Sequence, residues 1–243
     1  VNLSQRFSAL WTGGPWELYR RLRSVNPAPF AAFLDFGRVA VLSASPERFL
    51  QRQGDLIETR PIKGTRPRGG TPEEDRSLGQ ELATSAKDRA EHIMIVDLER
   101  SDLGRVAQTG TVTVDELMAL ESYATVHHLT STVRGRLRPD RTLADLLRAT
   151  FPGGSITGAP KIRAMEIIDE LEPVRRGVYT GAIGYFSATG DLDLSIAIRT
   201  LVLNDGVAHF QVGGGIVYDS DPEAEYRETL DKGRALFQAL AGG

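Results

Sequence analysis

Short runs of apolar residues, broken by turn residues, dominate the first sixty positions. The segments 29–36 ("PFAAFLDF") and 38–45 ("RVAVLSAS") predict two strands joined at a glycine. The segment 48–62 ("RFLQRQGDLIETRPI") predicts a hairpin that turns at Gly54-Asp55. The chain therefore opens with antiparallel strand pairs.

Helical periodicity follows. The segment 71–106 is helical in character and begins with Thr71 and Pro72, a typical helix start. The segments 142–151 and 159–172 are amphipathic and predict two more helices. Before these two helices and after the segment 71–106, the β-branched segment 123–137 ("YATVHHLTSTVRGRL") predicts a strand.

The C-terminal third returns to strands. The segments 177–187, 191–204 and 206–217 predict three strands joined by glycine-containing turns, which together form an antiparallel meander. A final helix is expected up to about Leu240, capped either by Ser220 with Glu223 or by Asp221 followed by Pro222. Its predicted core-facing stripe is Tyr226, Leu230, Phe237 and Leu240. Antiparallel strands intermixed with helices indicate an α+β fold, with large antiparallel sheets and helices packed around them.

Composition adds limits to this picture. The 243 residues are 41% hydrophobic and 25% charged, typical of a globular protein, and we expect one domain spanning 1–243. The chain has no cysteine, which excludes disulfides and thiolate chemistry. The net charge of -3 and the lack of a long apolar run favour neither a nucleic acid nor a membrane as partner. Because the chain begins with Val1, we expect that an upstream part of a longer protein is missing.

The segment 60–69, "RPIKGTRPRG", surrounds Lys63 with arginines in a stretch that glycine and proline predict to be a turn or loop. Like charges disfavour the protonated ammonium, and a neutral lysine is a nucleophile or a base. The alternative is a basic loop that binds a phosphate or carboxylate, or that faces water. The flanking arginines are Arg60, Arg66 and Arg68.

Two predicted helices carry acidic residues at helical spacing. Glu225, Glu228 and Lys232 group on one side of the last helix, and Asp88 and Glu91 are spaced i, i+3 beside a buried segment. Carboxylates of this kind suit Mg²⁺, although a solvated charged face is the simpler reading of the last helix. The glycine runs "QVGGGIVYDS" and "FPGGSITGAPK" could admit a carboxylate to backbone amides, and neither fits a dinucleotide or P-loop pattern.

Taken together and in order, seven motifs resemble the chorismate-utilising enzymes, which include anthranilate synthase component I, aminodeoxychorismate synthase component I, isochorismate synthase and salicylate synthase. The motifs are "SASPERF", "RPIKGTRPRG", "DRAEHIMIVDLERSDLGRV", "FPGGSITGAPKIRAMEIID", "YTGAIGYFS", "LSIAIRT" and "GGGIVYDSDPEAEYRETLDKGRAL". The resemblance covers essentially the whole chain. It implies a cytoplasmic enzyme that acts on chorismate with Mg²⁺.

The resemblance also implies roles for individual residues. Glu91 and Glu228 resemble the Mg²⁺ ligands, Asp88 and Glu225 would support them through water, and Glu47 resembles the general acid for the departing C4 hydroxyl. Tyr179, Arg199, Gly213 and Gly215 resemble the grip on the side-chain carboxylate. Further pocket residues are Thr65, His128, Ser155 and Lys232, and Thr157 is an alternative to Ser155.

Lys63 separates the subfamilies. "PIKGT" resembles aminodeoxychorismate synthase, whereas anthranilate synthases resemble "PIAGT". The resemblance therefore implies amination of chorismate through a lysine nucleophile, with ammonia from a glutamine amidotransferase subunit. The alternatives are anthranilate synthase component I and a non-catalytic or truncated relative that only binds chorismate. His92 and Arg100-Ser101 depart from the usual motif without touching the assigned ligands.

Overall fold

The computed structural model describes residues 1–123 and 126–241 as two compact units. The first unit comprises Val1–Glu47, Ile156–Gly184 and Leu194–Gly243, and the second comprises Arg48–Ser155 and Tyr185–Asp193. Each is described by itself. The α+β class is confirmed, and the prediction of one domain over 1–243 stays a prediction.

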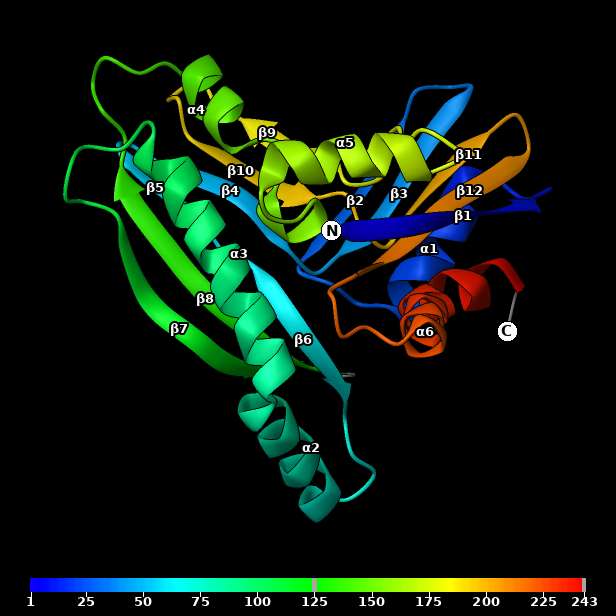
Figure 1. The fold of residues 1–243 in the computed structure, drawn as a ribbon. Coiled ribbons are helices and arrows are strands. Elements are labelled where there is room, and N and C mark those ends of the chain that lie inside the picture. The colour runs from blue at the N-terminus through cyan, green and yellow to red at the C-terminus, as the bar shows by residue number, and fades with distance from the viewer. Residues whose placement is uncertain (124–125, 242–243) are drawn as a thin grey trace. The chain divides into compact units, whose positions relative to one another are not determined.

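The first unit is built on a five-stranded antiparallel sheet in the order β1-β12-β11-β3-β2 (Figure 1). Its strands are β1 (Asn2–Leu10), β12 (Val207–Gly215), β11 (Thr200–Asn204), β3 (Val39–Ser45) and β2 (Phe30–Asp35). The predicted pairing of the segments 29–36 and 38–45 is confirmed as β2 with β3. The sheet also places β1, the first strand of the chain, beside β12, the last.

Two helices from opposite ends of the sequence cover this sheet with apolar side chains. They are α1 (Pro15–Val25) and α6 (Pro222–Ala241), and they pack on each other as well as on the strands. Leu22 of α1, Leu42 of β3 and Leu236 of α6 are fully buried in one cluster. The third helix of the unit, α5 (Lys161–Leu171), contacts β1.

The second unit is built on the other sheet, in the order β6-β8-β5-β4-β10-β9 with β7 added to β8. Its strands are β4 (Arg48–Gln53), β5 (Leu56–Thr59), β6 (Ile62–Pro67), β7 (Thr113–Ser122), β8 (Val126–Arg136), β9 (Ala182–Phe186) and β10 (Leu192–Ile196). Only residues 185–186 of β9 and 192–193 of β10 belong to this unit. The predicted hairpin with its turn at Gly54-Asp55 is confirmed as β4 and β5.

Helices α2 (Pro72–Thr84), α3 (Ala86–Gly104) and α4 (Leu143–Thr150) complete the second unit, followed by a short 3-10 turn at Gly154–Ile156. The predicted helix over 71–106 is two helices, because Ser85 ends α2 and its hydroxyl caps α3 by accepting from the Asp88 N–H (3.3 Å). The Thr71 hydroxyl accepts from the Glu74 N–H (3.2 Å), which confirms the predicted start. Helix α3 packs on β6 and β8 (Figure 1).

The predicted meander is wrong in its middle strand. Residues 191–204 form two strands in different sheets, with β10 paired to β9 and β11 paired to β12. The break lies at 197–199, where Arg199 has φ +51. The run "LSIAI" is apolar except for Ser195, so its pattern gives no sign that the chain passes from one sheet to the other.

The strand β7 has no counterpart among the predicted elements. It pairs with β8 through a register that shifts at Glu116 and again before Ala119, and Met118 has φ +56. These irregularities break the alternation that identifies a strand. In the predicted strand 123–137, Ala124 and Thr125 lie outside the described residues, and the structure has β8 from Val126.

Helix α6 starts as predicted, with Asp221 as the cap. The Asp221 carboxylate accepts from the Ala224 N–H (2.8 Å), whereas the Ser220 hydroxyl donates to Glu225 (2.7 Å). The predicted core stripe is confirmed in part: Leu240 packs against the core and the Phe237 ring contacts Phe210, whereas Tyr226 is 50% exposed. The residues that face inward are Glu225, Thr229, Gly233, Leu236 and Ala239. Small residues at 233 and 239 let the helix approach β12 closely, and this packing buries Glu225.

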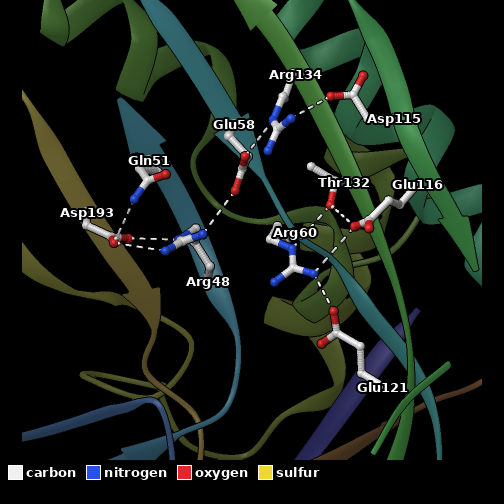
Figure 2. A network of polar contacts seen from close by, with 10 residues as sticks. All are labelled: Arg48, Gln51, Glu58, Arg60, Asp115, Glu116, Glu121, Thr132, Arg134 and Asp193. Atoms are coloured by element: carbon white, nitrogen blue, oxygen red, sulfur yellow. Dashed lines mark hydrogen bonds and ion pairs between the residues drawn. The ribbon is translucent and has the colours of Figure 1, made fainter. Parts of the chain in front are cut away.

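Ion pairs between neighbouring strands tie the second sheet together (Figure 2). Glu58 on β5 accepts from Arg48 on β4 (3.0 Å) and from Arg134 on β8 (2.7 Å). Arg48 also donates to Asp193, at the part of β10 that belongs to this unit (3.0 Å). The Glu58 side chain is only 7% exposed, so two cations depend on one buried carboxylate.

We expect Glu58→Gln to lower the free energy of unfolding of the second unit by about 2–3 kcal/mol, because Arg48 and Arg134 lose their shared anion. Asp55→Asn is the matched control on the same sheet. Its pair with Arg136 is more than half exposed on both sides, and its loss should cost less than about 1 kcal/mol. Urea denaturation measures both, and equal losses would show that Glu58 has no special weight.

Candidate functional site

The predicted site residues divide between the two units. The first unit carries Glu47, Tyr179, Arg199, Gly213, Gly215, Glu225, Glu228 and Lys232, and the second carries Lys63, Thr65, Asp88, Glu91, His128 and Ser155. Each unit brings some of its set together, as the following contacts show.

In the first unit, the Tyr179 hydroxyl lies against Gly213. A Cβ at Gly213 would come within 3.0 Å of that oxygen and 2.4 Å of the Leu3 carbonyl oxygen. Tyr179 is 8% exposed, and burial raises its pKa to about 12, although Arg176 and Arg199 act in the opposite direction. Its hydroxyl therefore stays neutral and able to donate a hydrogen bond near neutral pH.

Arg199 provides the positive charge beside this tyrosine. Burial lowers its pKa, and the charges of Glu47 and Glu228 act in the opposite direction. Its φ of +51 is unusual for an arginine, and Thr180, whose N–H donates to the Ala197 carbonyl (2.8 Å), has φ +63. Backbone strain of this kind is concentrated at functional sites. A guanidinium, a neutral hydroxyl and a glycine that admits close approach are groups suited to binding a carboxylate.

Glu47, the candidate general acid, is 4% exposed at the junction of β3 and β4. Its N–H donates to the Ser45 hydroxyl (3.3 Å), and its carbonyl oxygen accepts from the Ile196 N–H (3.0 Å). These backbone contacts fix the residue independently of its carboxyl group. The carboxyl is close enough to Arg199 to influence its charge.

Helix α6 presents Glu225 and Glu228 to β12. A Cβ at Gly214 would lie 3.4 Å from a Glu225 oxygen and 4.0 Å from a Glu228 oxygen. Lys232 is ion-paired with Glu228 and donates to the Gly213 carbonyl (3.1 Å). The predicted grouping of Glu225, Glu228 and Lys232 is therefore present, and the three side chains lie over the glycine run 213–215. Gly215, the last glycine of the run, lies opposite Asn2 of β1.

We expect Gly213→Ala to lower the free energy of unfolding of the first unit by about 1–3 kcal/mol, because the new methyl group meets a backbone oxygen that cannot move away cheaply. Gly214→Ala is the control on the same strand, since its methyl group reaches only ordinary contact distances. Thermal and urea denaturation of both variants decide the point. A Gly214→Ala variant that is as unstable as Gly213→Ala would contradict the close approach at 213.

In the second unit, Lys63 lies on β6, so the prediction of a turn or loop is wrong over Ile62–Pro67. Strand β6 lies at the edge of the sheet, where Pro67 is tolerated because no further strand needs its missing N–H. The register of β6 with β8 shifts between Lys63 and Thr65. Gly64 occupies this bulge with φ +81, and a Cβ there would come within 2.7 Å of Leu82. The glycine therefore shapes the strand rather than ending it.

The arginines around Lys63 do not act as predicted. Each guanidinium forms an ion pair with at least one carboxylate on a neighbouring element. The positive charge of the arginines is therefore balanced, although they are close to Lys63 in sequence. Figure 2 shows this for the first of them. The pairs are Arg60 with Glu121, Arg66 with Glu81 and Asp88, and Arg68 with Asp75.

Buried His92 is the neighbour of Lys63 that the sequence did not single out for a role. Burial is the main cause that lowers its pKa to about 4, and the charge of Lys63 acts in the same direction. Its Nε2 lies 2.6 Å from the Ser131 hydroxyl, which also accepts from the Met118 N–H (3.0 Å). Ser131 gives no signal in the sequence beyond its place in a β-branched strand.

The other residues assigned to the second unit are placed as follows. Thr65 and His128 face each other across β6 and β8, with the Thr65 hydroxyl 2.9 Å from His128 Nδ1. Ser155 of this unit and its alternative Thr157, which belongs to the first unit, are both buried, so burial does not choose between them. Asp88 accepts from Arg66 (3.2 Å), and Glu91 lies 4.0 Å from Lys87 on the same helix.

The donor set fits Mg²⁺ in kind. The helical carboxylates are hard oxygen ligands, and Mg²⁺ uses one or two of them while keeping waters. Within residues 1–123 and 126–241, no group of three or more histidine, aspartate and glutamate side chains is arranged to hold a metal ion. The assignment of Glu91, Glu228, Asp88 and Glu225 to the metal therefore stays a prediction. In the same described part of the chain, no helix is long and apolar enough to cross a membrane.

Comparison with known proteins identifies relatives of this chain. The chain is 57% identical over 241 residues to aminodeoxychorismate synthase component 1 of Klebsiella aerogenes, covering 99% of this chain and 53% of that protein. It is 52% identical over 238 residues to anthranilate synthase component 1 of Pseudomonas putida, covering 98% of this chain and 48% of that protein. The chain thus spans about half the length of the curated relatives it matches.

The fold also agrees with a solved structure. The crystal structure of anthranilate synthase component I from Streptococcus pneumoniae superimposes with a TM-score of 0.87 and 49% identity, over 95% of this chain and 51% of that one. The family model described as chorismate binding enzyme matches residues 1–238. The chain therefore belongs to the family of chorismate-binding enzymes.

Proposed function

We propose that the protein replaces the C4 hydroxyl of chorismate by an amino group, giving 4-amino-4-deoxychorismate. The observation that carries the proposal is Lys63, which lies on the bulged strand β6. In the resemblance described above, anthranilate synthases have alanine at this position, in the motif "PIAGT". The 57% and 55% identities to two aminodeoxychorismate synthases support it.

The proposed reaction has two substitutions. The Lys63 amine forms a bond to C2 as the C4–O bond breaks, and Glu47 protonates the departing hydroxyl so that it leaves as water. Ammonia then forms a bond to C4 as the bond between C2 and Lys63 breaks, which returns the lysine. Covalent catalysis replaces one difficult substitution by two easier ones. The enolpyruvyl ether is retained.

The first unit offers the groups that would hold the side-chain carboxylate of chorismate. The Arg199 guanidinium provides charge, Tyr179 provides a neutral donor, and Gly213 allows close approach. Gly215, Lys232, Thr65, His128 and Ser155 or Thr157 are the proposed further pocket residues. Bound Mg²⁺ would neutralise negative charge on the substrate.

The metal assignment makes a separate prediction. We expect Glu91→Gln and Glu228→Gln each to weaken the apparent affinity for Mg²⁺ by at least about 10–100-fold, because each loses one anionic oxygen and keeps its shape. Glu223→Gln is the control on α6, since that carboxylate is exposed and pairs with Arg227 on its own helix. The activity is titrated with Mg²⁺, and unchanged titration curves for both variants would disprove the assignment.

The names of the relatives support a partner. The name of the Klebsiella aerogenes protein includes the words "component 1", which imply that this protein works with a second component. We propose that a glutamine amidotransferase subunit supplies the ammonia and that the enzyme works in the cytoplasm. Free ammonium salts should replace the partner in the assay.

Anthranilate synthase component I is the second candidate, because relatives with that name are 52–54% identical over nearly the whole chain. Lys63 favours the first candidate, since anthranilate formation needs no lysine nucleophile. A non-catalytic relative that only binds chorismate is the third, and the set of carboxylates together with a candidate acid makes it less suitable.

The deciding experiment uses the full-length protein with chorismate, Mg²⁺ and an ammonium salt. Loss of chorismate absorbance is followed, and the product is identified by chromatography and mass spectrometry. Aminodeoxychorismate supports the proposal. Fluorescent anthranilate would support the second candidate, and chorismate binding without turnover would support the third.

A further inference from the structure

A buried ion pair in the first unit, between Glu172 and Arg176, has no place in the roles assigned so far. It lies just after α5, and its side chains are 5% and 13% exposed. Arg176 donates Nη2–H to Glu172 Oε1 (2.6 Å) and Nε–H to Oε2 (2.9 Å). This is the two-pronged geometry that fixes a guanidinium and a carboxylate in one orientation.

Both partners also bind the backbone of β1. Glu172 accepts from the Ser4 N–H (2.9 Å) and from the Ser4 hydroxyl (2.8 Å). Arg176 donates to the carbonyl oxygens of Asn2 (2.8 Å) and Ile156 (2.8 Å). The pair therefore clamps the first strand of the chain to the segment that leads out of α5.

The clamped residues are the ones opposite the two glycines of the candidate pocket. In the register of β1 with β12, Ser4 lies opposite Gly213 and Asn2 lies opposite Gly215. A Cβ at Gly213 would touch Leu3 and Ser4, so the position of β1 sets how close a ligand comes to this backbone.

The pair also reaches Tyr179. The Arg176 guanidinium carbon lies 5.7 Å from the centre of the Tyr179 ring, within the range of a cation–π contact. The Arg176 carbonyl oxygen accepts from the Tyr179 N–H (3.1 Å). One guanidinium thus contacts the ring whose hydroxyl faces Gly213 and also the strand on the other side of that glycine.

A purely stabilising role accounts for this arrangement poorly. Burying two charges is costly, and a buried ion pair is often no more stable than apolar side chains of the same volume. What apolar side chains could not supply is the fixed set of hydrogen bonds to Asn2, Ser4 and Ile156.

We propose that Glu172 and Arg176 are positioning residues, which hold β1 against Gly213 and Gly215 and aim the Tyr179 hydroxyl, and thereby set the affinity for the substrate carboxylate. The inference rests on the proposed function, with chorismate as the ligand. Neither residue touches the substrate or the reacting atoms.

The kinetic test compares Arg176→Gln and Arg176→Lys with the parent in the full-length protein. Arg176→Gln should raise KM for chorismate about tenfold or more and change kcat less than about threefold, because the pocket is displaced while the reacting groups remain. Arg176→Lys keeps the charge and should recover part of the affinity. Arg163→Gln is the control near the other end of α5, where the pair with Glu166 is exposed, and it should leave KM unchanged.

A second measurement needs no substrate. The protein is labelled with 3-fluorotyrosine, and the Tyr179 signal is assigned in ¹⁹F NMR spectra with Tyr179→Phe. The signal should shift in Arg176→Gln and stay in place in Arg163→Gln. If Arg176→Gln does not fold, Glu172→Gln, which keeps the size of the side chain, takes its place in both measurements.

An unchanged KM together with an unmoved Tyr179 signal would overturn the inference. So would a fall in kcat that matches the rise in KM and disappears when osmolytes restore stability, because that is the behaviour of a structural pair. A parent protein that neither binds nor converts chorismate would refute the proposed function, and the ¹⁹F signal would still show whether Arg176 positions Tyr179.

Discussion

Replacement of Lys63 by arginine or by methionine should reduce the formation of aminodeoxychorismate by more than about 10³-fold, the loss typical of removing a covalent nucleophile. Arginine keeps the positive charge, but its guanidinium stays protonated and cannot attack. Methionine keeps the length of the side chain without the amine. If Lys63 only bound a carboxylate by its charge, the arginine variant would retain activity and the methionine variant would not, so the two together separate the roles.

The adduct itself can be observed. Mass spectrometry of the parent, quenched with chorismate and Mg²⁺ but without ammonia, should show added mass on the peptide that contains Lys63. Lys161→Arg, at the start of α5, is the control and should retain both the adduct and the turnover. Lys63→Ala changes residues 61–65 to "PIAGT", and this variant should form some anthranilate by direct addition of ammonia at C2. A Lys63→Arg variant with the parent rate would return Lys63 to the role of a carboxylate-binding residue.

Local strand pairs could be predicted from the sequence because their information is local. The β4–β5 hairpin follows from the turn residues Gly54-Asp55 between two short segments that each contain adjacent apolar residues, and β2–β3 likewise follows from a glycine between two strands. The passage from β10 to β11 could not be predicted, since an apolar run looks the same whether it continues one strand or crosses between sheets. The pairing of β1 with β12 joins opposite ends of the chain, and no local pattern encodes it.

The charge around Lys63 shows a different limit. Arginines close in sequence suggested a cationic environment, but alternate residues of a strand point to opposite faces. On β6, Arg66 points toward Glu81 and Asp88 rather than toward the lysine. Charge balance depends on partners from α2, α3 and β7, which a reading of ten residues cannot include.

The face of α6 shows a third limit. The large apolar residues suggested a stripe that includes Tyr226, which is 50% exposed, whereas the buried face begins at Glu225 and runs through Gly233 and Ala239. Packing against β12 is decided by the small residues Gly233 and Ala239, which permit close approach. The same packing turns Glu225 inward, so the spacing of the acidic residues was predictable from sequence and their burial was not.

Glu47→Gln should lower kcat by about 10²–10⁴-fold and change KM for chorismate little, because a general acid acts in the transition state and an amide cannot donate the proton. The fold should survive. The backbone contacts of Glu47 with Ser45 and Ile196 do not involve its carboxyl group, and glutamine has the same shape. Steady-state kinetics of the full-length protein, with ammonium salts as the nitrogen source, measure both parameters.

The charge of Arg199 makes this test discriminating. Glu47 also influences the Arg199 guanidinium, so its loss removes one of the negative charges that act on Arg199. If the main role of Glu47 were to balance that charge, Glu47→Gln would alter the hold on the substrate carboxylate, and the change would appear in KM. Glu47→Asp separates the two further, because it keeps the negative charge near Arg199 and withdraws the acid by one methylene. A kcat that falls in both variants while KM stays constant assigns the proton to Glu47, and a defect confined to KM assigns Glu47 to binding.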